Sequence, residues 1–239
     1  MNSSWRTCNT TRKLRAAILL LLFALALAAA FFAYRRKLSN SRAVLAEKSA
    51  LKAEEGAYAE ASRLIDRALQ SPEDGSFTDE QLYLKKAEYI QQAGDSDQAL
   101  SIAMRVIKNT NEGQQEFDEA WERIVSICTE EEEFGKLATL LEGSGVESVK
   151  SRYYNYLVYD PVFRDPPGTY EDSLVLYIES QGAGAVFYTL DGTNPTEKSN
   201  LYSGPITLRP GIYTIKAFFI NRYGLRSNTV TGAYKITED

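Results

Sequence analysis

Three hydrophobic patterns follow one another along the chain, and each predicts a different kind of structure. Residues 16–34 contain no charged side chain. Between residues 43 and 156, apolar side chains recur every three or four positions, which is typical of amphipathic helices. From about residue 158, apolar and polar residues alternate, which is typical of strands with one buried face. Together the patterns predict a multidomain chain, α then β, that follows a single apolar segment.

The apolar segment, Ala16–Tyr34, has the length of a membrane-spanning helix. At about 1.5 Å per residue it would extend roughly 29 Å, close to the roughly 30 Å hydrocarbon core of a bilayer. A cleaved signal peptide is the alternative, because basic residues precede the segment and Ala26-Leu27-Ala28 has the small-residue spacing of a cleavage site. The apolar run continues beyond that site. We therefore expect a retained transmembrane helix over residues 16–34, in contact with the lipid bilayer, after a short basic tail over residues 1–15.

Basic residues flank the apolar segment equally, with four on each side. They are Arg6, Arg12, Lys13 and Arg15 before it and Arg35, Arg36, Lys37 and Arg42 after it. Because an excess of Lys and Arg marks the cytoplasmic side of a span, this tie leaves the orientation open. The domain type described below favours a cytoplasmic N-terminus, with the C-terminal domains on the outer side of the cell membrane.

The helical region repeats with a period of 38 residues. Gly56 and Gly94 are 38 positions apart, as are Tyr83 and Trp121, and the third copy has Glu132 in place of the turn glycine. The other positions that mark the copies are Tyr58, Ala61, Leu64, Ile65, Ala68 and Leu69; Ala87, Ile90, Ala99, Leu100, Ala103 and Val106; and Cys128, Phe134, Leu137 and Leu141. The aromatic residue, the turn glycine and the small residues of the second helix together resemble the tetratricopeptide repeat.

That family has a period of 34 residues, and the loops "SPEDGSF" and "NTNEGQQ" can absorb the roughly four extra positions. The resemblance implies a tetratricopeptide-like helical domain over residues 43–156. Such a domain serves either as a spacer and scaffold or as a groove that binds protein partners.

Negative charge is concentrated in the helical region. Residues 43–150 hold 23 acidic and 11 basic side chains, a net charge of −12, whereas residues 151–239 hold 9 and 8. Nucleic acid is not expected as a partner, because acidic surfaces repel phosphate. An acidic groove would instead favour a basic peptide or protein segment.

Little in the composition points to catalysis. The chain has no histidine, which removes His-based nucleophile systems, His general bases and His-ligated zinc. Cys8 and Cys128 lie on opposite sides of the apolar segment, so no disulfide is expected. The run of glutamates at 130–133 favours a solvated turn over a metal site, because consecutive helical residues do not face one point. We expect no catalytic, cofactor-binding or metal-binding residues.

A glycosidase is a further hypothesis, and it would need two facing carboxylates about 5 to 10 Å apart. The candidates in the β region are chiefly Glu171, Asp172, Glu179 and Asp191. They fall mostly in predicted turns, so we expect no enzyme activity.

The region from about residue 158 to 239 contains short runs rich in β-branched and aromatic residues, separated by glycine and proline turns. In the longest run, residues 213–220, alternation predicts one buried face and one polar face. The buried face is predicted to carry Tyr213, Ile215, Ala217 and Phe219, and the polar face Thr214 and Lys216.

The stretch "VFYTLDGTNPT" predicts a strand that ends in a turn. Asp191-Gly192 supplies the positive φ that a tight turn requires, and Pro195 stops the ladder because it lacks an amide donor. We expect Asp191 to accept hydrogen bonds from turn amides. A calcium or sugar contact at Asp191 and Asn194 is the alternative.

Residues 160–237 contain, in order, a P-G-x-Y opening, an aromatic-Y-T-x-D-G-x-x-P-T hairpin, an L-Y-x-G-P-I-x-L strand and a later Y-T-I-K-A strand. This segment resembles the chitobiase and β-hexosaminidase C-terminal domain family. The resemblance implies an immunoglobulin-like antiparallel β-sandwich over residues 158–239, of an accessory kind found on bacterial surface proteins and without a glycosidase site.

The expected function is that of a membrane-anchored, non-enzymatic scaffold or protein-interaction protein of the cell envelope. The alternative is a carbohydrate-binding accessory protein that brings a hydrolase to cell-surface glycan through the sandwich. A flat platform of exposed aromatic residues would favour this alternative.

Overall fold

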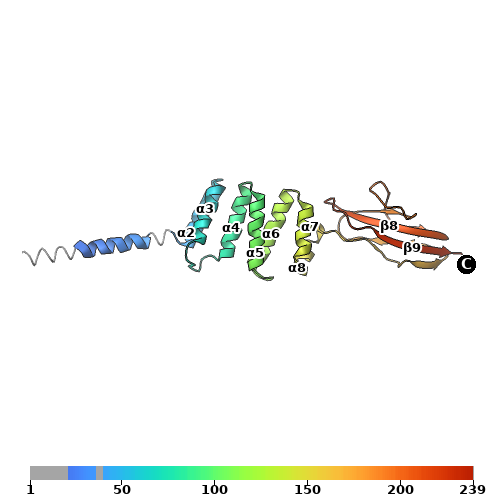
Figure 1. Cartoon of the computed structure of the whole chain (residues 1–239), viewed down its shortest axis with the longest axis horizontal. Coiled ribbons are helices and arrows are strands. Elements are labelled where there is room, and N and C mark those ends of the chain that lie inside the picture. Colours follow the sequence, from blue (N-terminus) through green and yellow to red (C-terminus); the bar gives the residue numbers. More distant parts are fainter. Residues whose placement is uncertain (1–20, 36–39, 239) are drawn as a thin grey trace, which may run out of the picture. The chain divides into compact units, whose positions relative to one another are not determined.

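The structure is a computed structural model that describes residues 21–35 and 40–238. It confirms the predicted order of helices followed by β-strands (Figure 1). The chain divides into two compact units, residues 1–123 and 124–239, and the division falls inside one helix, α6 (Gln115–Glu130). In the described residues, the first unit contains only helices, and the second contains helices and β-strands.

The predicted membrane segment is only partly described. Residues 1–20, which include the predicted basic tail and the start of the predicted span, lie outside the described residues. Residues 21–35 are helical, with exposed side chains. Among the described helices, none has both the length and the apolar character needed to cross a membrane.

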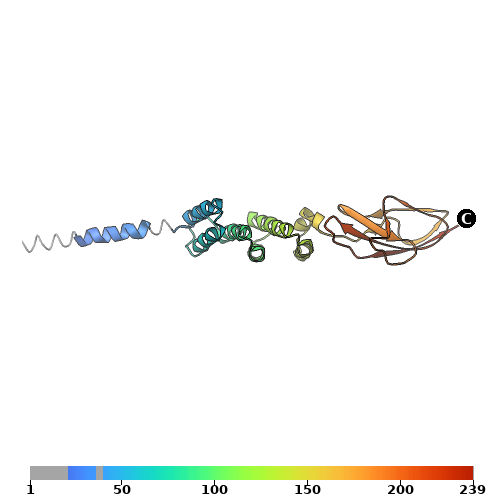
Figure 2. The ribbon, with the colours of Figure 1, turned by 90° about the horizontal axis from the view of Figure 1, so that it is seen from above.

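Four helices of the first unit lie side by side before the start of α6 (Figures 1 and 2). They are α2 (Arg42–Glu54), α3 (Tyr58–Leu69), α4 (Asp79–Gln92) and α5 (Ser96–Asn109). Polar side chains fix where helices begin: Thr78 and Gln81 form a capping box at α4, and Asp95 caps α5. The predicted small positions Ala61, Ala87 and Ala99 are fully buried, which allows the close helix contacts expected of them.

The 38-residue period is confirmed in the backbone of the turns. Gly56, Gly94 and Glu132 have φ angles of 76°, 89° and 57°, so all three adopt the left-handed conformation. The residue that follows each of these three donates its backbone N–H to the carbonyl of the residue five positions earlier. The three preceding helices therefore end with the same hydrogen bond. These bonds are Ala57 to Lys52 (2.9 Å), Asp95 to Ile90 (3.1 Å) and Glu133 to Cys128 (2.8 Å). The degenerate third copy therefore keeps the turn without its glycine.

Arg42, counted from the sequence as a cation flanking the membrane segment, belongs to the folded helical unit. Its side chain is buried, and its guanidinium lies 2.7 Å from the carboxylate of Asp79. It also donates to the backbone carbonyls of Ser71 and Phe77 at 3.2 and 3.0 Å. Arg42 thus ties the start of α2 to the loop that connects α3 with α4.

The second unit begins with the end of α6 and three further helical segments. These are α7 (Phe134–Gly143), α8 (Glu147–Arg152) and the 3-10 helix η1 (Tyr154–Tyr156). The strands that follow are β1 (Val162–Phe163), β2 (Gly168–Glu171), β3 (Leu174–Leu176), β4 (Ile178–Glu179), β5 (Gly184–Thr189), β6 (Asn200–Leu201), β7 (Ile206–Leu208), β8 (Gly211–Asn221) and β9 (Val230–Thr237). The predicted boundary at about residue 158 separates helices from strands, and whether the strands fold without α7 stays a prediction.

The strands form a five-stranded sheet in the order β2-β9-β8-β5-β6 and two smaller pairs, β1-β4 and β3-β7. One pair corrects the predicted antiparallel arrangement, because β2 lies parallel to β9, with Gly168 opposite Tyr234. A short hairpin forces antiparallel pairing, whereas strands from distant parts of the chain can also pair in parallel. β2 and β9 come from opposite ends of the β region and have no such hairpin between them.

The inner face of β8 is the face predicted from alternation. Ile215, Ala217 and Phe219 are at most 1% exposed, and Tyr213 packs against the same core. The side chains that share this core come from the smaller strand pairs and from β9, the neighbour of β8 in the sheet. They include Leu174, Leu176, Ile178, Leu208, Tyr234 and Ile236.

The outer face of the same strand is not wholly polar, contrary to the alternation. Phe218 is 0% exposed. The ring of Phe187 stacks on it at 5.5 Å, and the guanidinium of Arg226 lies 3.8 Å from its centroid. Residue type on one strand cannot reveal this burial, because the covering groups come from β5 and from the turn after β8.

Aromatic rings join α7 to the β region within the second unit. Tyr223, in the turn after β8, stacks on Phe134 at 4.5 Å and on Tyr156 at 4.9 Å between centroids. Burial, together with a hydrogen bond to Tyr223, raises the pKa of the Tyr156 hydroxyl. The β region is therefore packed directly against the last helices of the chain.

We expect Phe219→Ala to lower the free energy of unfolding of the second unit by about 3 to 5 kcal/mol, because it empties a fully packed core position. Ile212 is the matched control, since it lies on the same strand and is 82% exposed. Ile212→Ala should change stability by less than about 0.5 kcal/mol. Hydrogen exchange of the β8 amides in the full chain measures both values. Equal effects of the two substitutions would show that the buried face is assigned wrongly.

Glu132→Gly should stabilise the chain by about 1 kcal/mol, because it removes the steric cost of a left-handed non-glycine residue. Gly94→Ala is the reciprocal variant at the equivalent turn. An added Cβ there would meet no atom within 4 Å, so any cost comes from the backbone conformation alone. Thermal and denaturant unfolding compare the two variants with the natural chain. A loss of stability in Glu132→Gly contradicts the equivalence of the turns.

Candidate functional site

A hollow with a volume of about 480 Å³ lies between α3, α4 and α5 of the helical unit. The partly buried side chains of Leu69, Tyr83 and Ile102 give it an apolar lining. Polar side chains complete its surface: Asp66, Gln70, Lys86, Ser101 and Arg105. Each helix contributes both kinds of residue, so the hollow depends on how neighbouring helices pack.

Two contacts hold the charged side chains around the hollow in place. Lys86 forms an ion pair with Asp66, with 2.6 Å between nitrogen and oxygen. The guanidinium of Arg105 lies over the ring of Tyr83, 4.2 Å from its centroid. Tyr83 was identified from the sequence as the aromatic residue of the repeat. The sequence does not identify the charged residues Asp66, Lys86 and Arg105 as parts of a site, because the pattern of one helix does not show which side chains meet those of another helix.

The Asp-Gly segment of the β region forms the predicted turn. Gly192 has φ 78°. One carboxylate oxygen of Asp191 accepts hydrogen bonds from the Thr193 amide at 3.1 Å and the Thr193 hydroxyl at 2.6 Å. The pKa of Asp191 is held below its ordinary value by these bonds, with the hydroxyl bond as the largest cause. A low pKa keeps the carboxylate ionised as a turn acceptor.

The loop after this turn folds back over the outer face of the sheet. The ammonium of Lys216 donates to the side-chain oxygen of Asn194 at 2.8 Å, and Arg226 donates to the carbonyl of Pro195 at 3.4 Å. The oxygen that Asn194 would offer to calcium or sugar therefore already has a cationic partner. Among the described residues, no group of three or more His, Cys, Asp or Glu side chains is placed to hold a metal ion.

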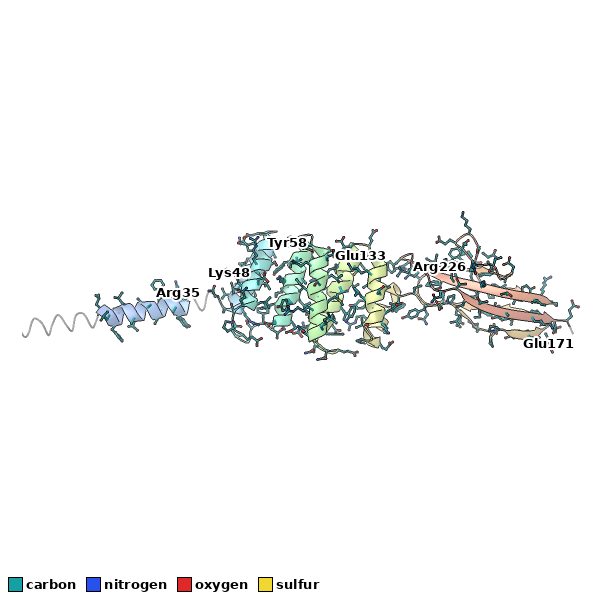
Figure 3. The ribbon with its side chains drawn as sticks, in the orientation of Figure 1. Arg35, Lys48, Tyr58, Glu133, Glu171 and Arg226 are labelled. Atoms are coloured by element: carbon teal, nitrogen blue, oxygen red, sulfur yellow. The ribbon has the colours of Figure 1, made fainter. Side chains whose placement is uncertain are left out.

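The other carboxylates considered for a glycosidase lie in separate elements. Glu179 of β4 accepts two hydrogen-bonding contacts from Arg164, at 2.6 and 2.7 Å. Glu171 ends β2 at the end of the strands opposite to Arg226 (Figure 3), and Asp172 follows it with φ 61°. Glu179 and Asp191 thus have structural partners of their own.

Among the described residues, no cysteine thiol is exposed. Cys128 is buried and not in a disulfide, and burial raises the pKa of its thiol. A raised pKa lowers the fraction of reactive thiolate. Cys8 lies outside the described residues.

The exposed side chains of the β region give little support to a sugar-binding platform. The large apolar residues exposed between positions 151 and 238 are Tyr154, Tyr159, Val162, Val175, Leu201 and Ile212. Only two of these carry a ring, and both precede the first strand. Flat aromatic faces, which supply stacking surface to ligands, are thus largely buried or half-buried on the strands.

Comparison with known families identifies one match. A family model described as Fn3 associated matches residues 176–234, from the end of β3 into β9. The match covers strands and none of the helices. It supports a C-terminal β domain of a fibronectin-III-associated kind, and it does not confirm the resemblance to the chitobiase family. No curated protein matches the chain.

Asp191 should titrate with a midpoint below its ordinary value of 3.8. Because the folded-state pKa is depressed, its contribution to turn stability is present above the unfolded value and is lost as pH falls through the folded value. Thr193→Val removes the largest cause and should move the midpoint upward. Thr231→Val, at an exposed position of β9, should leave the midpoint unchanged. Carboxyl carbon shifts in an NMR titration measure all three midpoints, and a midpoint above 3.8 in the natural chain contradicts the assigned role.

Proposed function

We propose that the chain is a membrane-anchored, non-enzymatic scaffold that binds a partner protein through its helical repeats. The observation that carries this proposal is the hollow between α3, α4 and α5, which combines an apolar lining with charged groups at its edge. Binding sites commonly have this combination, in which apolar surface supplies affinity and a few polar groups supply specificity. The tetratricopeptide-like repeat pattern supports the same interpretation.

The anchor in this proposal is the apolar segment 16–34, with the N-terminus cytoplasmic and both folded units outside the cell. Its support is the uncharged sequence and its length. Alkaline extraction of membranes and N-terminal sequencing of the mature protein test it. A mature N-terminus near Ala29 would show that the segment is removed.

The β region has an accessory role in this proposal, as an immunoglobulin-like module carried beyond the helices. Binding of glycan by this module is the less supported alternative, because exposed rings are few on its strands. The absence of histidine and the structural partners of Glu179 and Asp191 support a non-enzymatic role. Turnover of aryl glycosides by the purified chain, lost on Asp191→Ala without unfolding, would contradict it.

Site-specific photo-cross-linking in living cells can locate the binding surface in the full chain. A photoreactive amino acid at Ser101 would stand on the exposed edge of the hollow. The same group at Ile212 would stand on an exposed position of β8. We expect a discrete cross-linked protein from position 101 and none from position 212, because the proposed binding surface lies on the helices.

Cross-links from Ile212 alone would move the binding surface to the β region and leave the helices as a spacer. Cross-links from neither position would contradict a protein-binding role for either tested surface. Thr139, exposed on α7, provides an additional helical control at the position 38 residues after Ser101.

A further inference from the structure

The helical region is strongly acidic, but the hollow between α3, α4 and α5 is not. Residues 43–150 carry a net charge of −12. The charged residues that line the hollow are one acid, Asp66, and two bases, Lys86 and Arg105. Asp66 and Lys86 form an ion pair with each other at 2.6 Å. The hollow therefore has one positive charge left over, on Arg105.

Arg105 is placed to receive an anion. In the described part of the chain, the guanidinium of Arg105 forms no ion pair with a carboxylate, and it lies over the ring of Tyr83, 4.2 Å from the centroid. Stacking on a ring restrains a guanidinium while leaving its N–H edge available. A planar carboxylate matches that edge with two parallel hydrogen bonds.

The apolar lining lies beside this cation. Leu69, Tyr83 and Ile102 come from three different helices and are each partly buried. Such a surface can cover an apolar side chain that water would otherwise surround. The hollow therefore offers two adjacent environments, one for a carboxylate and one for an apolar group.

Resting on the proposed function, we propose that this hollow binds an internal segment of a partner protein in which an acidic residue is next to an apolar residue. The carboxylate binds Arg105, and the apolar side chain lies against Leu69 and Ile102. The rest of the segment is neutral or basic, because the surrounding region is acidic and repels further negative charge. A polyanion such as nucleic acid is excluded by the same repulsion.

The test uses the full chain in detergent micelles and an array of short peptides of varied sequence. Each peptide is acetylated and amidated, so that only side chains can supply a carboxylate. Bound peptides should be enriched in Asp or Glu beside Leu, Ile or Phe. Arg105→Gln should weaken the strongest binder by roughly 10- to 100-fold, the usual effect of losing a charge-assisted hydrogen bond.

Three further variants separate the causes. Arg105→Lys keeps the charge but cannot form two parallel hydrogen bonds with a carboxylate. Its affinity for the strongest binder should therefore fall between those of the natural chain and Arg105→Gln. Ile102→Ala should reduce the preference for the apolar residue while keeping the preference for the acid. Arg63→Gln, which changes an exposed arginine of α3 that does not line this hollow, should have no effect. Circular dichroism confirms that each variant remains helical.

Binders without an enrichment in acidic residues, or an acidic binder held equally by Arg105→Gln, would overturn this inference and leave the proposed protein-binding role intact. An array on which the natural chain retains no peptide also overturns it. The cross-link from position 101 then decides separately whether the helices bind any protein in cells.

Discussion

Every helix of the array needs a neighbour to cover its apolar face. A single helix pair leaves such a face exposed, so stability comes from stacking one pair on the next. The end of the array lacks a further full pair, because α8 has only 6 residues. In the second unit, Tyr223 stacks on Phe134 of α7. Leu225 lies 4.0 Å from where a Cβ on Gly135 would be. The turn after β8 thus covers the last long helix in place of another repeat.

One buried side chain shapes that covering turn. Asn221, at the end of β8, is 5% exposed. Its side-chain oxygen accepts hydrogen bonds from the amides of Tyr223 and Leu225, both at 3.0 Å. Its side-chain nitrogen donates to the carbonyl of Leu157 at 3.3 Å. The same residue therefore positions the two side chains that cover α7 and fastens the turn to the segment entering the β region.

Features set by neighbouring residues in the chain were predictable, and those set by distant neighbours were not. The turn residues Gly56 and Gly94 are visible in sequence because a left-handed backbone favours glycine, and Gly192 is visible for the same reason. Burial of Phe219 follows from alternation along one strand. Burial of Phe218, the parallel pairing of β2 with β9, and the meeting of Arg105 with Tyr83 each require groups from separate elements. Nothing in the local pattern specifies which distant groups meet.

The position of Arg42 changes the charge balance around the apolar segment. From sequence, four basic residues stand on each side of it, which gives no orientation. In the folded unit Arg42 is buried and paired with Asp79, so its charge is already neutralised within the protein. Removing it from the balance leaves four basic residues before the segment and three after it. Lys48 and Lys52, which follow Tyr34 by 14 and 18 positions, also lie within the range that the charge rule counts, so the Lys and Arg content leaves the orientation open and the proposal rests on the domain type.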